Sequence, residues 1–195
     1  YSDESTMETM AQLVVKADES TASLIFETVV TEQQNMITED NTPANNFALD
    51  LMNNLSNVDS SVVSSMYETQ GDLVDNMMTT ALSDISSEDS EAIANIISST
   101  GNDEITEMVF NNIAYSNDKS LTTDVFTTLA ESEAGADAII TMASANQSLY
   151  ENIAQDIDPT KMTAASLYTD TTMQYNSPTT AASTTASTAD TTTYS

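Results

Sequence analysis

The chain has 195 residues and a formal net charge of −28, because thirty-one carboxylates are set against three lysines, with no arginine and no histidine. Nucleic acids and anionic membrane surfaces are poor partners for such a chain, since binding them needs Lys and Arg to neutralise phosphate or lipid charge. The self-repulsion also opposes compaction unless salt or divalent cations screen it.

The residues that most catalytic sites depend on are missing. Without cysteine or histidine the chain has no disulfide, no thiolate metal site and none of the usual nucleophile–base pairs. A catalytic pair of carboxylates of the kind that glycosidases use is formally possible. The carboxylates of this chain, however, fall at predicted turns and helix ends, with no group of aromatic residues nearby on which a sugar could stack. We therefore expect a non-enzymatic protein that requires no cofactor.

The composition favours an extracellular or cell-surface protein. Only 17% of the residues are charged, so the polar surface consists mostly of Ser, Thr, Asn and Gln rather than of paired Lys and Glu. No apolar run approaches the roughly 20 residues of a membrane span, and we expect no direct membrane insertion. Because the first residue is Tyr1, we expect a processed product or a part of something longer.

Apolar residues at helical spacing predict an N-terminal helical hairpin over residues 1–42. In its first helix they are Met7, Met10, Leu13 and Val14, and in its second, which extends towards Ile37, they are Leu24, Ile25, Val29 and Val30. The polar segment 39–43 is the predicted linker to the next part of the chain. Its last residue, Pro43, is suited to opening a helix.

Residues 43–158 are predicted to form a helical-repeat domain of about 3.5 two-helix units. Residues 73–78 align with 105–110, and residues 51–55 align with 109–113. The apolar positions of the later helices are Leu73, Met77, Met78, Ala81 and Leu82; Ala92, Ile93, Ile96 and Ile97; Ile105, Val109 and Ile113; Leu121, Val125 and Leu129; Ile139, Ile140 and Met142; Leu149, Tyr150 and Ile153. The fold class is therefore all-α, either tandem hairpins in a short α-solenoid or an irregular helical bundle.

Three glycines mark the predicted ends of helices in this domain. Gly71, Gly101 and Gly135 each follow an apolar helical pattern and are followed within two residues by Asp. A glycine just past a helix adopts the left-handed conformation that closes it. An Asp or Asn beyond it can cap the next helix through its side-chain oxygen.

The last segment, 159–195, is rich in Ser, Thr and Ala. Such a run cannot bury enough apolar surface to order itself, which predicts a flexible tether. Threonine also favours strands, so the segment could become an extended arm beside a neighbouring chain.

Two groups of carboxylates are candidate cation ligands, since Ca²⁺ prefers six to eight oxygen ligands. They are Asp84, Glu88, Asp89 and Glu91 around one predicted turn, and Asp156 with Asp158 near the end of the repeats. Neither group has the spacing of an EF-hand loop. Helix capping with diffuse counterion attraction accounts for the same residues, and weak Ca²⁺ binding between acidic faces of subunits is the alternative.

The stretch Ser87–Ile97 places a polar turn ahead of a helix with small apolar side chains. In this pattern it resembles the helical repeats of flagellar-motor switch proteins and of the cytoplasmic domains of magnesium transporters. The resemblance covers roughly residues 45–158 and implies a fold of stacked helical hairpins. Those families carry many Lys and Arg, which this chain lacks, and no functional residue is carried over.

Two functions remain open at this stage. The first is a structural or adhesive subunit of an extracellular assembly, a homo-oligomer or polymer that associates through repeat ends and terminal arms with the help of cations. The second is an acidic helical scaffold that binds a basic protein partner.

Overall fold

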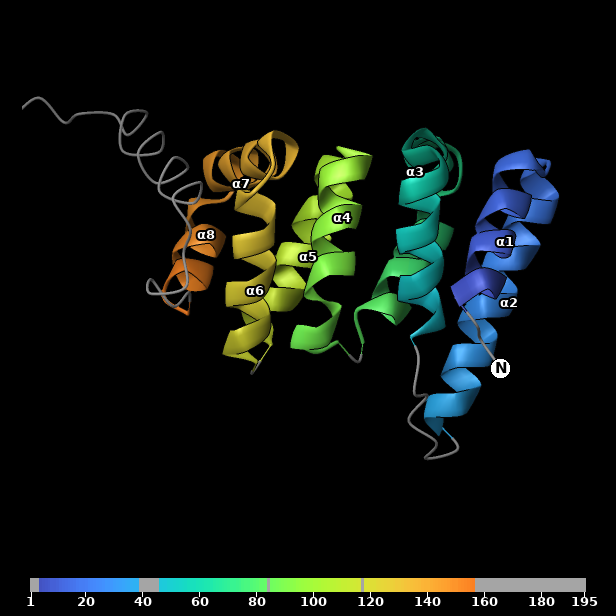
Figure 1. Ribbon diagram of the computed structural model, residues 1–195, viewed down its shortest axis with the longest axis horizontal. Coiled ribbons are helices and arrows are strands. Elements are labelled where there is room, and N and C mark those ends of the chain that lie inside the picture. The colour runs from blue at the N-terminus through green and yellow to red at the C-terminus, as the bar shows by residue number, and fades with distance from the viewer. Residues whose placement is uncertain (1–3, 39–45, 84, 117, 157–195) are drawn as a thin grey trace, which may run out of the picture.

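The chain is a stack of helices in a computed structural model that describes residues 4–38, 46–83, 85–116 and 118–156 (Figure 1). Of these residues 89% are helical, and no strand occurs among them. The helices are α1 (Glu4–Lys16), α2 (Glu19–Thr38), α3 (Phe47–Ala81), the short 3-10 helix η1 (Ser87–Asp89), α4 (Ser90–Thr100), α5 (Asp103–Tyr115), α6 (Lys119–Ala130), α7 (Glu133–Ala145) and α8 (Gln147–Ala154). The predicted all-α class is confirmed.

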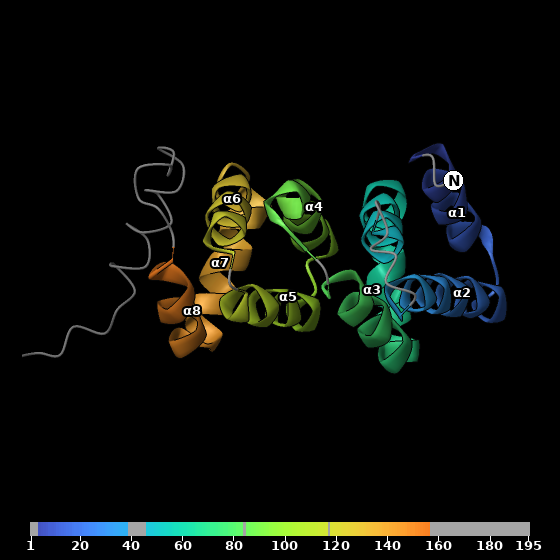
Figure 2. The same ribbon diagram turned by 90° about the horizontal axis from the view of Figure 1, so that it is seen from below.

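The helices lie in two rows, which are visible from below in Figure 2. One row contains α1, the first part of α3, α4 and α6, and the other contains α2, the last part of α3, α5 and α8. Within the first row α4 packs against α3 and α6, while α7 packs against α4 and α6. This alternation of successive helices between two rows is the arrangement that stacked hairpins produce.

One cluster of buried apolar side chains connects the whole stack, from Met7 in α1 to Ile153 in α8. Met77 and Met78, predicted as core residues, are fully buried. Between α5 and α6 the rings of Phe110 and Phe126 pack with centroids 5.3 Å apart and planes tilted by 54°. Such aromatic pairs add about 1 kcal/mol beyond the apolar area that they bury. The predicted boundaries near 42 and 158, the linker at Pro43 and the tail 159–195 lie outside the described residues.

The longest helix, α3, is interrupted at Asp59 and Gln70, whose backbone angles are non-helical, and it is thereby divided into the segments 47–58, 60–69 and 71–81. At the first break the Asp59 carboxylate accepts hydrogen bonds from the backbone N–H and the hydroxyl of Ser61, at 3.1 and 2.6 Å. The Asp59 side chain thereby caps the segment 60–69, because it accepts from a backbone N–H group that has no partner within the helix. The breaks allow α3 to contribute to both rows.

The second break is held by contacts on both sides of it. The hydroxyl of Ser23 in α2 donates a hydrogen bond to the side chain of Gln70. Tyr67, before the break, lies close enough to Asp75, after it, for the charge of that carboxylate to act on the Tyr67 hydroxyl. Burial raises the pKa of Tyr67, and the negative charge of Asp75 raises it further.

The three glycines have different roles. Gly101 ends α4 with a φ of 56°, and Asn102 then caps α5, as predicted. The prediction was wrong for Gly71, which lies within α3, one residue past the break at Gln70. It was also wrong for Gly135, which lies in the first turn of α7, where a Cβ would be 2.2 Å from the carbonyl oxygen of Leu129. Glycine is therefore needed at position 135 because the backbones of α6 and α7 approach each other closely there, and not because the chain makes a left-handed turn.

Replacing Gly135 and Gly71 by alanine should have opposite effects on stability. Gly135→Ala forces a Cβ into the backbone of Leu129 and should lower the free energy of unfolding by about 2 kcal/mol. Gly71→Ala meets no atom within 4 Å and should raise it by about 0.5 kcal/mol, since alanine restricts the unfolded chain. Urea unfolding followed by circular dichroism measures both. Equal effects of the two substitutions would contradict the packing of α7 on Leu129.

Tyr67→Phe should change how stability depends on alkaline pH. Between the ordinary tyrosine pKa of about 10 and the raised value in the folded protein, the unfolded chain binds fewer protons than the folded one. The free energy of unfolding of the native protein therefore falls as the pH rises through this window. In Tyr67→Phe the fall should be shallower, as measured by urea unfolding below and above pH 10. Identical pH profiles of the two proteins would contradict the burial of the Tyr67 hydroxyl beside Asp75.

Candidate functional site: two surface grooves and a terminal hairpin

A polar groove with a volume of about 630 Å³ crosses the row formed by α3, α4 and α6. It is lined by Asn53 and Asn57 of α3, Glu88 of η1, Glu91, Ala92, Ala94, Asn95 and Ser98 of α4, Thr128 of α6, and Ser132. We call it the amide groove. Amides, hydroxyls and carboxylates form most of its lining, and no lysine is among the lining residues.

Three asparagines form a hydrogen-bonded cluster in the amide groove. The side-chain nitrogen of Asn95 donates to the oxygens of Asn53 and Asn57, at 2.6 and 3.1 Å. The oxygen of Asn95 accepts from the hydroxyl of Ser99 at 3.0 Å. These bonds fix the orientation of the three amides. They join α3 to α4 without any charged group.

The predicted turn carboxylates have separate roles around this groove. Asp89 accepts hydrogen bonds from the backbone N–H and the hydroxyl of Ser86, at 2.8 and 3.2 Å, and so forms a capping box with it. Glu88 and Glu91 line the groove with exposed side chains. Asp84, the fourth member of the predicted group, lies outside the described residues.

The second predicted pair of cation ligands lies at the other end of the stack. Asp156 forms a salt bridge with Lys119 at the start of α6, with 2.5 Å between the nitrogen and the oxygen. Asp158 lies outside the described residues. Within the described ranges no three acidic side chains come close enough together to hold a metal ion. Weak Ca²⁺ binding between subunits stays a prediction.

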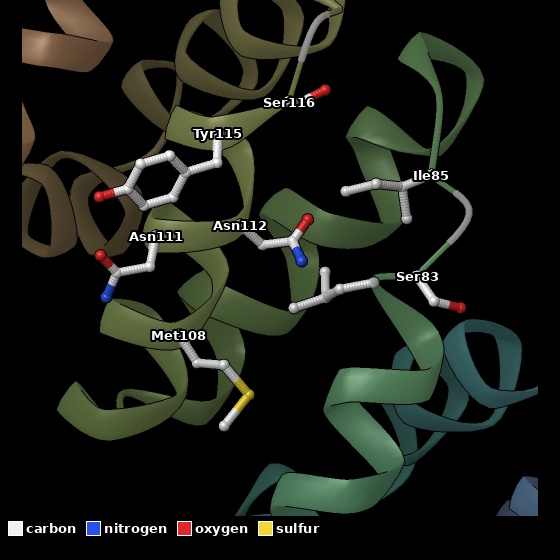
Figure 3. Close-up of a pocket in the computed structure, with 8 residues that line it drawn as sticks. Ser83, Ile85, Met108, Asn111, Asn112, Tyr115 and Ser116 are labelled. Atoms are coloured by element: carbon white, nitrogen blue, oxygen red, sulfur yellow. The ribbon is translucent and has the colours of Figure 1, made fainter.

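A second groove, of about 520 Å³, lies between the end of α3 and the outer face of α5 (Figure 3). Met108, Asn111, Asn112 and Tyr115 follow one face of α5, and Leu82, Ser83 and Ile85 lie opposite. Tyr115 is 82% exposed. In Figure 3 its ring points away from Ser83 and Ile85, which lie on the other side of the groove.

The terminal hairpin of α1 and α2 carries two exposed leucines. Leu13 is 55% exposed and Leu24 is 62% exposed, whereas Ala11 and Phe26 of the same helices are fully buried. Residues two apart on a helix are separated by about 200°. The leucines therefore lie on the side of the hairpin away from the core. This hairpin forms one end of the stack (Figure 1).

Asn53, Asn57 and Asn95 were not identified from the sequence. They lie on polar faces of helices, where solvated side chains are the default interpretation. The available signal was the spacing of four between Asn53 and Asn57, which places both on one side of α3. Their proximity to Asn95 depends on the packing of α3 against α4, which the spacing does not reveal.

Compared with known proteins, the chain matches no family model, no curated protein and no solved structure. None of the helices in the described ranges has the length and apolar character needed to span a membrane. The function must therefore be argued from the surfaces described above.

Salt should stabilise this protein. With a net charge of −28, neighbouring carboxylates repel one another across the stack, and screening weakens that repulsion. Raising NaCl from low to near-molar concentration should increase Tm by at least about 3 °C, the shift that ~1 kcal/mol produces at this chain length. Calorimetry measures the change, and CaCl₂ at matched ionic strength separates specific cation binding from screening. A constant or falling Tm would contradict repulsion as the dominant electrostatic effect.

Proposed function

We propose that this chain is a non-enzymatic structural or adhesive subunit of an extracellular or cell-surface assembly, in which copies associate through the ends of their helical stacks. The observation that carries the proposal is the pair of exposed leucines, Leu13 and Leu24, on the terminal hairpin. A helical stack buries apolar residues between successive hairpins, so an end hairpin with apolar residues on its outer side can accept a further hairpin.

The electrostatics add a requirement to this association. Two copies with a charge of −28 repel each other at low ionic strength. Cations between the acidic faces reduce this repulsion, so the assembly should form more readily with Ca²⁺ than with a chelator. A contact between the two unlike ends of the stack is heterologous, and it builds filaments if it does not close into a ring.

A second function, an acidic scaffold that binds a basic protein partner, is favoured by a different observation. The amide groove carries two exposed carboxylates and no lysine among its lining residues. This surface is complementary to a cationic ligand. The two functions use different surfaces and can be tested separately.

Removing the exposed leucines should abolish self-association. In Leu13→Ser/Leu24→Ser the outer side of the hairpin becomes polar while the buried residues stay unchanged. Sedimentation velocity and negative-stain electron microscopy with Ca²⁺ should show polymers of the native protein and single particles of the double variant. Val58→Ser is the matched control, since Val58 is an exposed apolar residue, 40% accessible, on α3.

The control variant should polymerise like the native protein. Single particles of the native protein, both with Ca²⁺ and with chelator, would reject the proposal. Polymers of the double variant equal to those of the native protein would reject the role of the hairpin.

A further inference from the structure

The amide groove offers the groups that an extended peptide needs. An extended peptide has backbone N–H and C=O groups without partners, and a side-chain amide can donate to one and accept from the other. Two side-chain amides with a donor still available, those of Asn53 and Asn57, line the groove. The groove also provides the carboxylates of Glu88 and Glu91, which as ions are acceptors alone.

The hydrogen bonds within the cluster leave specific donors available. Asn95 donates to the oxygens of Asn53 and Asn57, so the amide nitrogens of these two residues remain as donors. Within the part of the chain that the structure describes, neither of these two nitrogens donates a hydrogen bond. Asn53 and Asn57 are one helical turn apart, about 6 Å along α3. Carbonyl groups on one edge of an extended peptide repeat every two residues, or about 6.7 Å, which is close to this spacing.

The carboxylates determine which peptide the groove would prefer. Glu88 and Glu91 are three residues apart near the start of α4, and both are exposed. The described lysines lie elsewhere, Lys16 in the last turn of α1 and Lys119 in the salt bridge with Asp156. A Lys or Arg side chain of a ligand therefore has two acceptors and no competing cation of this chain in the groove.

We propose that the amide groove binds an extended, Lys- or Arg-bearing peptide segment of another protein. Asn53 and Asn57 donate to alternate carbonyl groups of the peptide, and Glu88 and Glu91 hold a cationic side chain. Acidic peptides are disfavoured by the two carboxylates. Sugars are disfavoured because no aromatic side chain, the usual platform for a sugar ring, lines the groove. The inference identifies the partner and the site of the second function, and it does not depend on self-association.

The test uses the full chain and a labelled synthetic octapeptide in which Lys and Thr alternate. Fluorescence anisotropy at low salt should show saturable binding with one peptide per chain. Glu88→Gln/Glu91→Gln should weaken binding about tenfold, a loss of about 1.4 kcal/mol. The matched control is Glu104→Gln/Glu107→Gln, which removes the same charge, at the same spacing, from the first turns of α5. Its affinity should stay close to that of the native protein.

Two further probes separate backbone recognition from charge. The same peptide with ester links in place of its backbone amides keeps its side-chain charges, but ester carbonyls are weaker hydrogen-bond acceptors than amide carbonyls, and it should bind at least about threefold more weakly. Asn57→Ala, at an exposed position, should weaken the unmodified peptide while leaving the circular dichroism spectrum unchanged.

Three outcomes would overturn the inference. They are absence of saturable binding by the native protein, equal losses in the two double Glu→Gln variants, and equal affinity for the ester-linked and unmodified peptides. Equal losses would show that the net charge attracts the peptide without a site. Whether the native protein forms polymers has no bearing on peptide binding in the amide groove. Self-association and peptide binding can therefore be rejected independently of each other.

Discussion

The scarcity of cations is the constraint on which the rest of this structure depends. In the described residues one salt bridge is formed, between Lys119 and Asp156. Helices of other proteins gain stability from ion pairs on their surfaces, and this chain cannot. Its polar residues must therefore stabilise the helix ends and the contacts between helices through hydrogen bonds. These bonds need no positively charged side chain.

Capping is the main form of this compensation. A side-chain oxygen accepts from a free backbone N–H at the start of most helices in the described ranges. The capping residues are Asp18, Asn46, Ser86, Asn102, Asp118, Ser132 and Asn146. Such caps contribute typically about 1 kcal/mol each. The Asn53–Asn57–Asn95 cluster extends the same chemistry to a contact between helices.

The fold class was predictable because apolar spacing depends on the chain alone. The positions chosen in α4, α5 and α6, such as Ile93, Ile105 and Val125, are buried. Other features depend on packing and could not be predicted. The close approach at Gly135 depends on where Leu129 lies, and the break at Gln70 depends on Ser23, which is 47 residues earlier.

The candidate sites divide in the same way. Glu88 and Glu91 were identified from the sequence as a local acidic turn, although as cation ligands, and they lie together in the amide groove. The asparagines that accompany them come from α3 and α4, and their proximity is a property of the stack. Local charge is visible in a sequence, whereas a groove formed by separate helices is not.

The few lysines also determine where proteases can cut. Trypsin-type enzymes cleave after Lys or Arg, and this chain has three lysines and no arginine. Lys119 stands in the first turn of α6, behind the Asp118 cap, and its side chain is bound to Asp156. Cleavage there requires α6 to unwind from its start, because proteases bind their substrates as extended strands. The peptide bond after Lys119 is therefore protected from such enzymes for as long as the start of α6 stays folded.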